Sequence, residues 1–144
     1  MFISDVLRTK GHQVVTVTPD ASVRHLLTVL AEHGIGAVVV SGDGAAVDGI
    51  VSERDVVRAL AARGPAVLEE PVAVIHTAVV HSCPPDARVV DLMRLMSEHR
   101  FRHVPVVLDG RLHGMVSIGD VVKNRIDELE GEHEALSQYI SGDR

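Results

Sequence analysis

Two aspartates in matching sequence contexts are the residues best suited to hold a ligand. Asp55 lies three residues after Ser52, and Asp120 lies three residues after Ser117, each where a run of helical apolar spacing begins. A carboxylate at a helix start can accept hydrogen bonds from both hydroxyls of a ribose, and such charge-assisted bonds are strong and directional. The serine hydroxyl and the unpaired amides of a helix start suit a phosphate group. The same spacing is also typical of a helix capping box, so both interpretations stand.

An internal repeat places these two motifs at equivalent positions. Residues 19–40 align with residues 85–106, and nine of the 22 aligned positions are identical. Residues 49–58 align with residues 114–123, and six of the ten positions are identical. A unit of about 60 residues is marginal alone, because it buries too little of its surface. We therefore expect two copies that share a buried face, with equivalent loops from both lining a cleft between them.

The local pattern of each copy is β-α-β-β-α, which predicts an α/β (α+β) fold of two tandem repeats packed as a pseudo-two-fold pair. Asp20 or Ser22 is expected to cap the first long helix, and Asp86 its counterpart. Strands are expected at 14–17, 37–40, 47–51, 79–80, 103–107 and 112–116, and helices at 22–33, at 88–99 and from Ser52 and Ser117 onward. The predicted division is a first repeat with its lead-in at 1–62, a connection at 63–78, a second repeat at 79–125, and a C-terminal amphipathic helix and tail at 126–144.

The last helix is predicted to extend well past the second repeat. Within 119–140 one stripe is formed by Val122, Ile126, Leu129, His133, Leu136 and Ile140. Such a stripe either packs on its own domain or forms the contact of a homodimer.

Composition argues against several classes of function. The 144 residues carry a net charge of -6 and only three aromatic residues, so the basic face and stacking rings of a nucleic-acid binder are missing. Cys83 is the single cysteine, which fits a reducing compartment, and we expect a cytoplasmic protein. The longest apolar run, 34–40, is too short to cross a membrane. No metal-binding, nucleophile-elbow or P-loop motif is present, so neither a metal site nor an enzyme is predicted.

The duplicated motifs resemble those of a known family. Gly-Ile-Val-Ser-x-x-Asp at 49–55 and Gly-Met-Val-Ser-x-x-Asp at 114–120, with Val-Thr-Val-Thr-Pro at 15–19 and His-Arg-Phe-Arg-His-Val-Pro-Val at 99–106, are similar to the CBS domain pair, or Bateman module. The resemblance covers roughly residues 3–125 and is strongest to small stand-alone bacterial proteins of this kind. It implies two clefts that bind adenosine-containing ligands such as AMP, ADP, ATP, NAD or S-adenosylmethionine, in a regulatory role without chemistry on the ligand. No further cofactor is implied.

The resemblance and the residue chemistry together give a set of candidate ligand-binding residues. By resemblance, Asp120 should work with Lys10, Val14, Ile35 and Gly36, whereas Asp55 should work with Thr77, Val79, Phe101, Arg102 and His103. Arg54, Arg102 and His103 are the candidates for phosphate contacts. Arg54 matches Gly119 in the repeat, so one cleft should be more cationic than the other. The full set is Lys10, Val14, Ile35, Gly36, Ala37, Ser52, Arg54, Asp55, Thr77, Val79, Phe101, Arg102, His103, Val104, Pro105, Ser117 and Asp120.

Each candidate also has a simpler explanation. Ile35, Val79 and Val104 are equally suited to core packing, and the arginines to a solvated surface. The leading prediction is a regulatory homodimer that senses an adenine nucleotide such as AMP, ATP or NAD and acts on another protein. The alternative is a structural adaptor that dimerises without a ligand, and a weaker one is a nucleotide hydrolase using Glu53 or His103.

Overall fold

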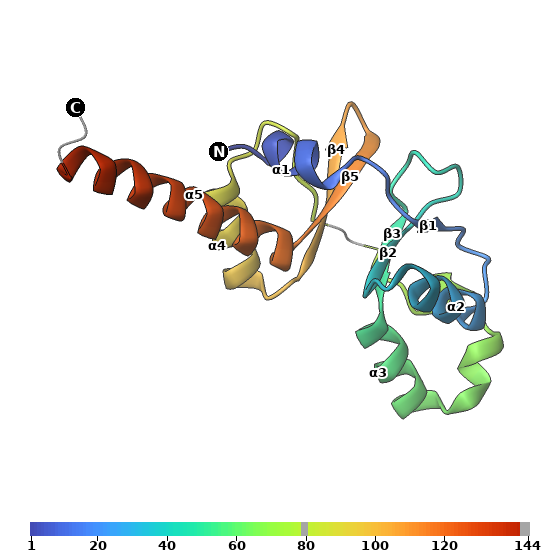
Figure 1. Cartoon of the computed structure of the whole chain (residues 1–144). Helices are drawn as coiled ribbons and strands as arrows, with labels where there is room; N and C mark the ends of the chain where they lie inside the picture. Colours follow the sequence, from blue (N-terminus) through green and yellow to red (C-terminus); the bar gives the residue numbers. More distant parts are fainter. Residues whose placement is uncertain (79–80, 142–144) are drawn as a thin grey trace.

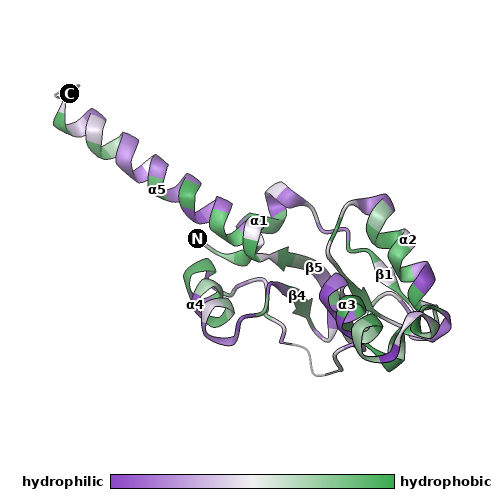
Figure 2. Cartoon of the chain, turned by 90° about the horizontal axis from the view of Figure 1, so that it is seen from below, coloured by the Kyte–Doolittle hydropathy of each residue, from purple (hydrophilic) through white to green (hydrophobic). Residues whose placement is uncertain are grey.

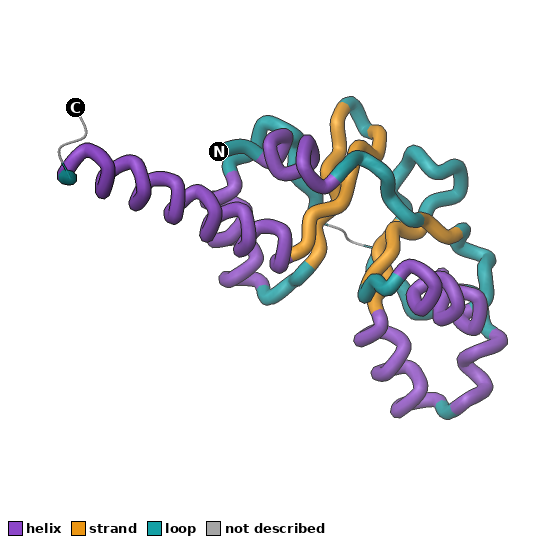
Figure 3. The backbone as a smooth tube through the Cα atoms, viewed as in Figure 1, coloured by secondary structure: helices purple, strands orange, loops and turns teal. Residues whose placement is uncertain are grey.

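The chain folds into two α/β units, each built around its own small sheet (Figures 1 and 3). The computed structural model describes residues 1–78 and 81–141, so the expected strand at 79–80 lies outside the described residues. The first unit contains β1 (Thr16–Val17), α2 (Val23–His33), β2 (Ala37–Val40), β3 (Gly49–Ser52) and α3 (Glu53–Arg63). The second contains α4 (Val89–His99), β4 (His103–Leu108), β5 (Arg111–Ser117) and α5 (Ile118–Ile140). The predicted fold of tandem repeats with a C-terminal helix is confirmed.

Strand pairing follows the same plan in both units. β2 pairs in parallel with β1 and antiparallel with β3, and β4 pairs antiparallel with β5. Cys83 forms an isolated parallel bridge with Val106 at the place that β1 occupies in the first unit. The two cores are separate clusters of aliphatic side chains, one around Leu26 and Val38 and the other around Leu92 and Met96.

Each unit is completed by a helical segment that lies outside its own repeat in the sequence. α1 (Ile3–Lys10) precedes the first repeat in sequence, yet it packs in the core of the second unit, with the Ile3 amide donating to the Ala87 carbonyl. Two short 3-10 helices, Pro65–Glu69 and Val72–Val74, lie against the first unit in the same way, and the Val72 amide donates to the Ala21 carbonyl. The exchange ties the two units together across the chain.

The helix starts show which predicted caps form. Ser22 caps α2 by accepting a hydrogen bond from the His25 amide, as expected. The prediction that Asp86 caps α4 is wrong, because the N-cap residue is Arg88 and no side chain caps the helix. The backbone of residues 85–89 is instead tied to the N-terminal segment, since the Val89 amide donates to the Met1 carbonyl. Among the described residues, no helix has the length and apolar content needed to span a membrane.

Candidate functional site: a cleft beside Asp55

Both serine–aspartate motifs stand where a strand passes directly into a helix. At the start of α3, Asp55 Oδ2 accepts hydrogen bonds from the Ser52 amide at 2.8 Å and the Ser52 hydroxyl at 3.1 Å. At the start of α5, the corresponding distances from Ser117 to Asp120 Oδ2 are both 2.9 Å. Each pair forms a capping box, so the capping interpretation holds at both motifs. Among the described residues, only Oδ2 of Asp55 takes part in the cap. Oδ1 is therefore available to a ligand.

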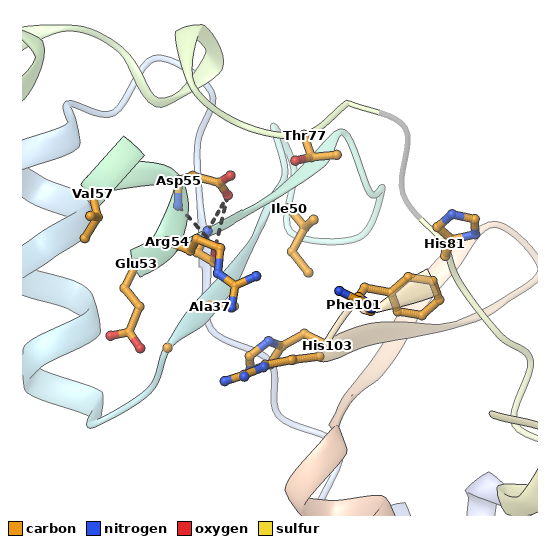
Figure 4. A pocket seen from close by; sticks show the side chains of 14 residues that line it. Ala37, Ile50, Glu53, Arg54, Asp55, Val57, Thr77, His81, Phe101 and His103 are labelled. Carbon is orange, nitrogen blue, oxygen red and sulfur yellow. Dashed lines mark hydrogen bonds between the residues drawn. The ribbon is translucent and has the colours of Figure 1, made fainter. Parts of the chain in front are cut away.

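A cavity of about 570 Å³ opens in front of Asp55, between the two units (Figure 4). Its volume lies in the range typical of small-molecule sites. The predicted residues that line it are Gly36, Ala37, Ser52, Arg54, Asp55, Thr77, Phe101, Arg102 and His103. Glu53, named only for the hydrolase alternative, also lines it, and the lining residues that were not predicted are Ile50, Val57, His81 and Arg100. The structure therefore brings Asp55 together with most of the partners expected for it.

Gly36 lies in this cavity although it was expected beside Asp120. Its carbonyl accepts a hydrogen bond from the Glu53 amide, which ties the beginning of β2 to the beginning of α3 in the same unit. The equivalent bond in the second unit runs from the Ile118 amide to the Arg102 carbonyl. The hydrogen bond from the Glu53 amide holds Gly36 next to the Asp55 motif.

Three arginines give the cavity a cationic wall. Arg54 extends from the start of α3 into the cavity, facing Phe101 and His103 (Figure 4), and Arg100 and Arg102 come from the second unit. Among the described residues, none of the three forms an ion pair with a carboxylate. Guanidinium groups without a protein partner are suited to phosphate oxygens, which they can bind through two parallel hydrogen bonds.

Arg100 has a backbone conformation that is costly for an arginine. It ends α4 with φ 59 and ψ 27, in the left-handed region, and its repeat equivalent Gly34 has φ 61 and ψ 38. Glycine is the usual residue at such a position because it has no Cβ. The signal was visible in the sequence, where the repeat places an arginine against a helix-ending glycine.

Replacing Arg100 by glycine should lower the affinity for a nucleotide without lowering the free energy of unfolding. Removing the left-handed strain offsets the backbone entropy of glycine, so the free energy of unfolding should stay unchanged or rise by up to about 1 kcal/mol. Affinity for a nucleotide polyphosphate should fall roughly 10-fold, because one charge-assisted contact is lost. Urea unfolding and calorimetric titration with ATP measure the two effects. An Arg100→Gly protein that binds ATP as tightly as the parent would exclude Arg100 from the site.

Aromatic rings cover another wall of the cavity. The Phe101 ring stacks on His81 with centroids 4.7 Å apart and on His99 at 5.9 Å, and the two histidine rings lie 5.5 Å apart. Ile50 and Thr77 lie on the side of the cavity nearer these rings, whereas Val57 lies on the opposite side, beyond Glu53 and Arg54 (Figure 4). A flat apolar surface next to a cationic one suits a molecule with a planar base at one end and phosphates at the other.

The pKa of His103 lies below its ordinary value. Burial is the largest cause that lowers its pKa below the ordinary 6.5, the charges of Lys10 and Arg102 lower it further, and Asp120 and Glu53 oppose the shift. The unfolded chain therefore takes up this proton first, and the contribution of His103 to stability is lost as the pH falls below about 6.5.

This histidine predicts a pH dependence with a definite sign. The free energy of unfolding of the parent, minus that of a His103→Gln protein, should decrease between pH 7.5 and pH 5. Saturating ATP should reduce or reverse the decrease, because a nearby phosphate favours the imidazolium. Urea unfolding over this pH range gives both curves. Parallel curves for the two proteins without ATP would contradict the assigned burial of His103.

The Asp120 motif is arranged differently. Lys10 Nζ donates to Asp120 Oδ2 at 2.5 Å and to the Met115 carbonyl at 2.7 Å. Burial acts to raise the pKa of Asp120, but the hydrogen bonds from Lys10 and Ser117 outweigh it and hold the pKa below its ordinary value. Lys10 and Ser117 therefore lie beside Asp120, as the resemblance implied, with the lysine directly on the carboxylate.

The other predicted residues lie outside the Asp55 cavity. Ile35 lines a separate hollow with Leu27 and Leu30, and Val14 is half-buried just before β1. Val104 is fully buried in the second core, and Pro105 is buried in β4. Val79 falls outside the described residues. The described part of the chain contains no cluster of three metal-ligating side chains.

Comparison with known proteins agrees with the repeat. The CBS domain family model matches residues 3–62 and 72–127. The mitochondrial CBS domain-containing protein CBSX3 of Arabidopsis thaliana is 35% identical over 148 residues, which cover 97% of this chain and 72% of that protein. The CBS-domain containing protein ATU1752 of Agrobacterium tumefaciens superimposes with a TM-score of 0.83 at 48% identity, covering 87% of this chain and 99% of that one. The CBS domain pair of MJ0100, solved with 5'-methylthioadenosine and S-adenosyl-L-methionine, has the same fold, with a TM-score of 0.77 at 23% identity over 89% of this chain and 98% of that one.

Proposed function

This chain belongs to the CBS domain family, whose paired domains are regulatory modules, and on that premise we propose that it senses an adenine nucleotide bound in the Asp55 cavity. The observation that carries the proposal is the composition of the cavity wall. One side offers the Asp55 carboxylate, another the Phe101 ring cluster, and a third the unpaired guanidinium groups of Arg54, Arg100 and Arg102. These suit a ribose, an adenine and phosphates respectively.

The cationic wall favours a nucleotide with two or more phosphates. MJ0100 binds 5'-methylthioadenosine, which is uncharged, and S-adenosyl-L-methionine, which carries a sulfonium. The three arginines outnumber the carboxylates of Glu53 and Asp55 in the lining, so the cavity disfavours a sulfonium and favours a diphosphate or triphosphate. We therefore rank ATP and ADP above AMP, and AMP above S-adenosylmethionine. NAD, with its pyrophosphate, belongs with the upper group if the cavity accepts its second nucleoside.

The ligand is bound and released without chemistry. A hydrolase would need a water-activating group next to the scissile phosphate, and no catalytic motif in the sequence supplies one beyond Glu53 or His103. Occupancy is passed on as a change in shape or in subunit packing, because a ligand shifts an equilibrium only when it binds one state better than the other. We propose that the protein acts in this way as a homodimer in the cytoplasm, on another protein. Cys83 is a core residue of the second unit, and burial raises the pKa of its thiol to about 11.

Thermal unfolding with a panel of ligands tests the proposal. The panel is AMP, ADP, ATP, NAD, NADH and S-adenosylmethionine, each with the parent, Asp55→Ala and Asp120→Ala proteins. A ligand at 100 times its dissociation constant adds about 2.7 kcal/mol, which corresponds to a rise in Tm of roughly 5–10 °C for a chain of this size. We expect that rise with ATP or ADP in the parent and its loss in Asp55→Ala.

The competing function is a ligand-free adaptor, and the capping boxes at both aspartates favour it. In that case both alanine variants should simply melt earlier, and no nucleotide should raise the Tm of any of the three proteins. A hydrolase would reveal itself by product accumulating from ATP above the blank rate.

A further inference from the structure

The second half of α5 stands clear of the rest of the chain. Figures 1 and 3 show the helix leaving the body beyond α4, and every residue from 129 to 140 is exposed. An isolated helical stretch of about 12 residues is marginal in water, since most helical stability comes from packing of an apolar face. We propose that α5 pairs with α5 of a second copy of this chain, antiparallel and in one defined register.

The exposed apolar side chains have the spacing of a two-stranded helical seam. They alternate at intervals of four and three residues along α5, and Figure 2 shows the resulting alternation of green and purple bands. The seam consists of Val122, Ile126, Leu129, His133, Leu136 and Ile140. Ile126, Leu129 and Leu136 are 49%, 47% and 57% exposed, which is a large apolar area to leave in water along one line. A heptad spacing of this kind is what a partner helix of the same spacing would cover.

The charges beside the seam identify the orientation of the partner. Lys123 and Arg125 flank its first half, and Glu130 and Glu132 flank its second half. In an antiparallel pair that places Val122 against the partner's His133 and Ile126 against the partner's Leu129, Lys123 meets the partner's Glu130. Arg125, which also forms an ion pair with Glu128 of its own helix at 3.2 Å, meets the partner's Glu132 in the same arrangement. The dyad makes each contact twice, so all four flanking charges on each chain find the opposite sign.

Other alignments lose this complementarity. Sliding the antiparallel pair by one heptad places Glu130 against the partner's Glu130 in one direction, or Lys123 against the partner's Lys123 in the other. A parallel pair retains only the contact between Arg125 and the partner's Glu130, and it sets the two His133 side chains against each other. Flanking charges of the same sign oppose pairing, so the charges favour the first register, although the slide that brings the two Glu130 residues together would also cover Leu136 and Ile140.

The inference rests on the proposed homodimer, and its failure can be told apart from failure of the dimer itself. In a Cys83→Ala background, three proteins carry Val122→Cys, His133→Cys, or both. In the proposed register residues 122 and 133 of opposite chains face each other, whereas two copies of one position lie about 16 Å apart along the seam. A disulfide needs Cα atoms within about 7 Å, so only the double variant can cross-link.

The three proteins are mildly oxidised and run on a non-reducing gel, which shows whether a disulfide joins the two chains. Light scattering of the same samples gives the mass of the assembly. We expect dimer mass for all three proteins and a covalent dimer for the double variant alone. Cross-linking of His133→Cys by itself would establish a parallel pair and overturn the proposal. Dimer mass without any cross-link would place the dimer contact elsewhere and also overturn it, while monomer mass throughout would overturn the proposed homodimer.

A charge exchange provides a second readout that needs no cysteine. Lys123→Glu should weaken dimerisation about 2- to 10-fold, because two cross-chain pairs become repulsive. Lys123→Glu with Glu130→Lys should restore it. Unchanged dimerisation in the single variant would contradict the register, since among the alignments compared only the proposed one brings Lys123 close to a partner charge of opposite sign.

Discussion

Asp55→Ala should weaken the binding of ATP by roughly 10- to 150-fold, which is the expected effect of removing a charged hydrogen-bond partner. Asp55 lines the same cavity as Arg54 and Phe101, and among the described residues its cap uses only Oδ2, so a bound ribose could take Oδ1. Alanine also removes the cap of α3, which costs about 1 kcal/mol of stability whether or not a ligand binds. Calorimetric titration measures the affinity directly and is unaffected by the cap as long as the protein is folded.

Asp120→Ala is the matched control for this variant. It removes an equivalent capping box at the start of α5, so the loss of helix capping is the same in kind. It also frees Lys10 from its carboxylate, but it leaves the wall of the Asp55 cavity intact. We expect ATP affinity within about 3-fold of the parent, because the lost interactions lie outside the cavity. Equal losses in the two variants would contradict the assignment of the ligand to Asp55.

Leu7→Ala should destabilise the protein by about 2–5 kcal/mol, a large share of the stability of a single domain. Leu7 is 1% exposed, although it lies near the N-terminus, because α1 is inserted into the core of the second unit. Its side chain fills the space above Gly114, where an added Cβ would lie 2.7 Å from Leu7 Cδ2. Urea unfolding measures the loss. Arg8→Ala, on the exposed side of the same helix, should change stability by less than about 0.5 kcal/mol.

The contact between Leu7 and Gly114 predicts coupling between two substitutions. Gly114→Ala should cost about 1–3 kcal/mol in the parent, since the new methyl group forces Leu7 to move. It should cost clearly less in the Leu7→Ala protein, where that space is vacant. Additive losses would mean that the two residues do not touch, and that α1 is held to the second unit by its backbone contacts alone.

Local patterns were enough to predict most of the elements. The β-branched runs and helical spacings match β2, β3, α2 and α4 to within one or two residues, because periodicity and turn residues are local properties. The internal repeat predicted two units, since a copy of about 60 residues is marginal alone, but each unit has its own cluster of buried side chains. The insertion of α1 into the second unit was not predicted, because it depends on contacts between residues that are far apart in the sequence.

Only part of the candidate site was predictable from the sequence. The repeat and the resemblance together grouped Asp55 with Thr77, Phe101, Arg102 and His103, and the structure gathers these residues around one cavity. Arg100 was not among the predicted site residues, although it belongs to the 99–106 motif that carries the resemblance. Gly36 was predicted beside Asp120, and its place in the Asp55 cavity was not foreseen, because the bond between its carbonyl and the Glu53 amide depends on how β2 meets α3.

Mapping ATP on the protein by NMR tests the central claim most directly. Amide spectra of the 15.5 kDa chain are recorded during titration with ATP, and the shifted signals are assigned to residues. We predict that the largest shifts fall at residues 52–55, at Thr77 and at 100–103, with those at 115–120 small. Shifts centred on Lys10 and Asp120, or none at millimolar ATP, would contradict binding in the Asp55 cavity.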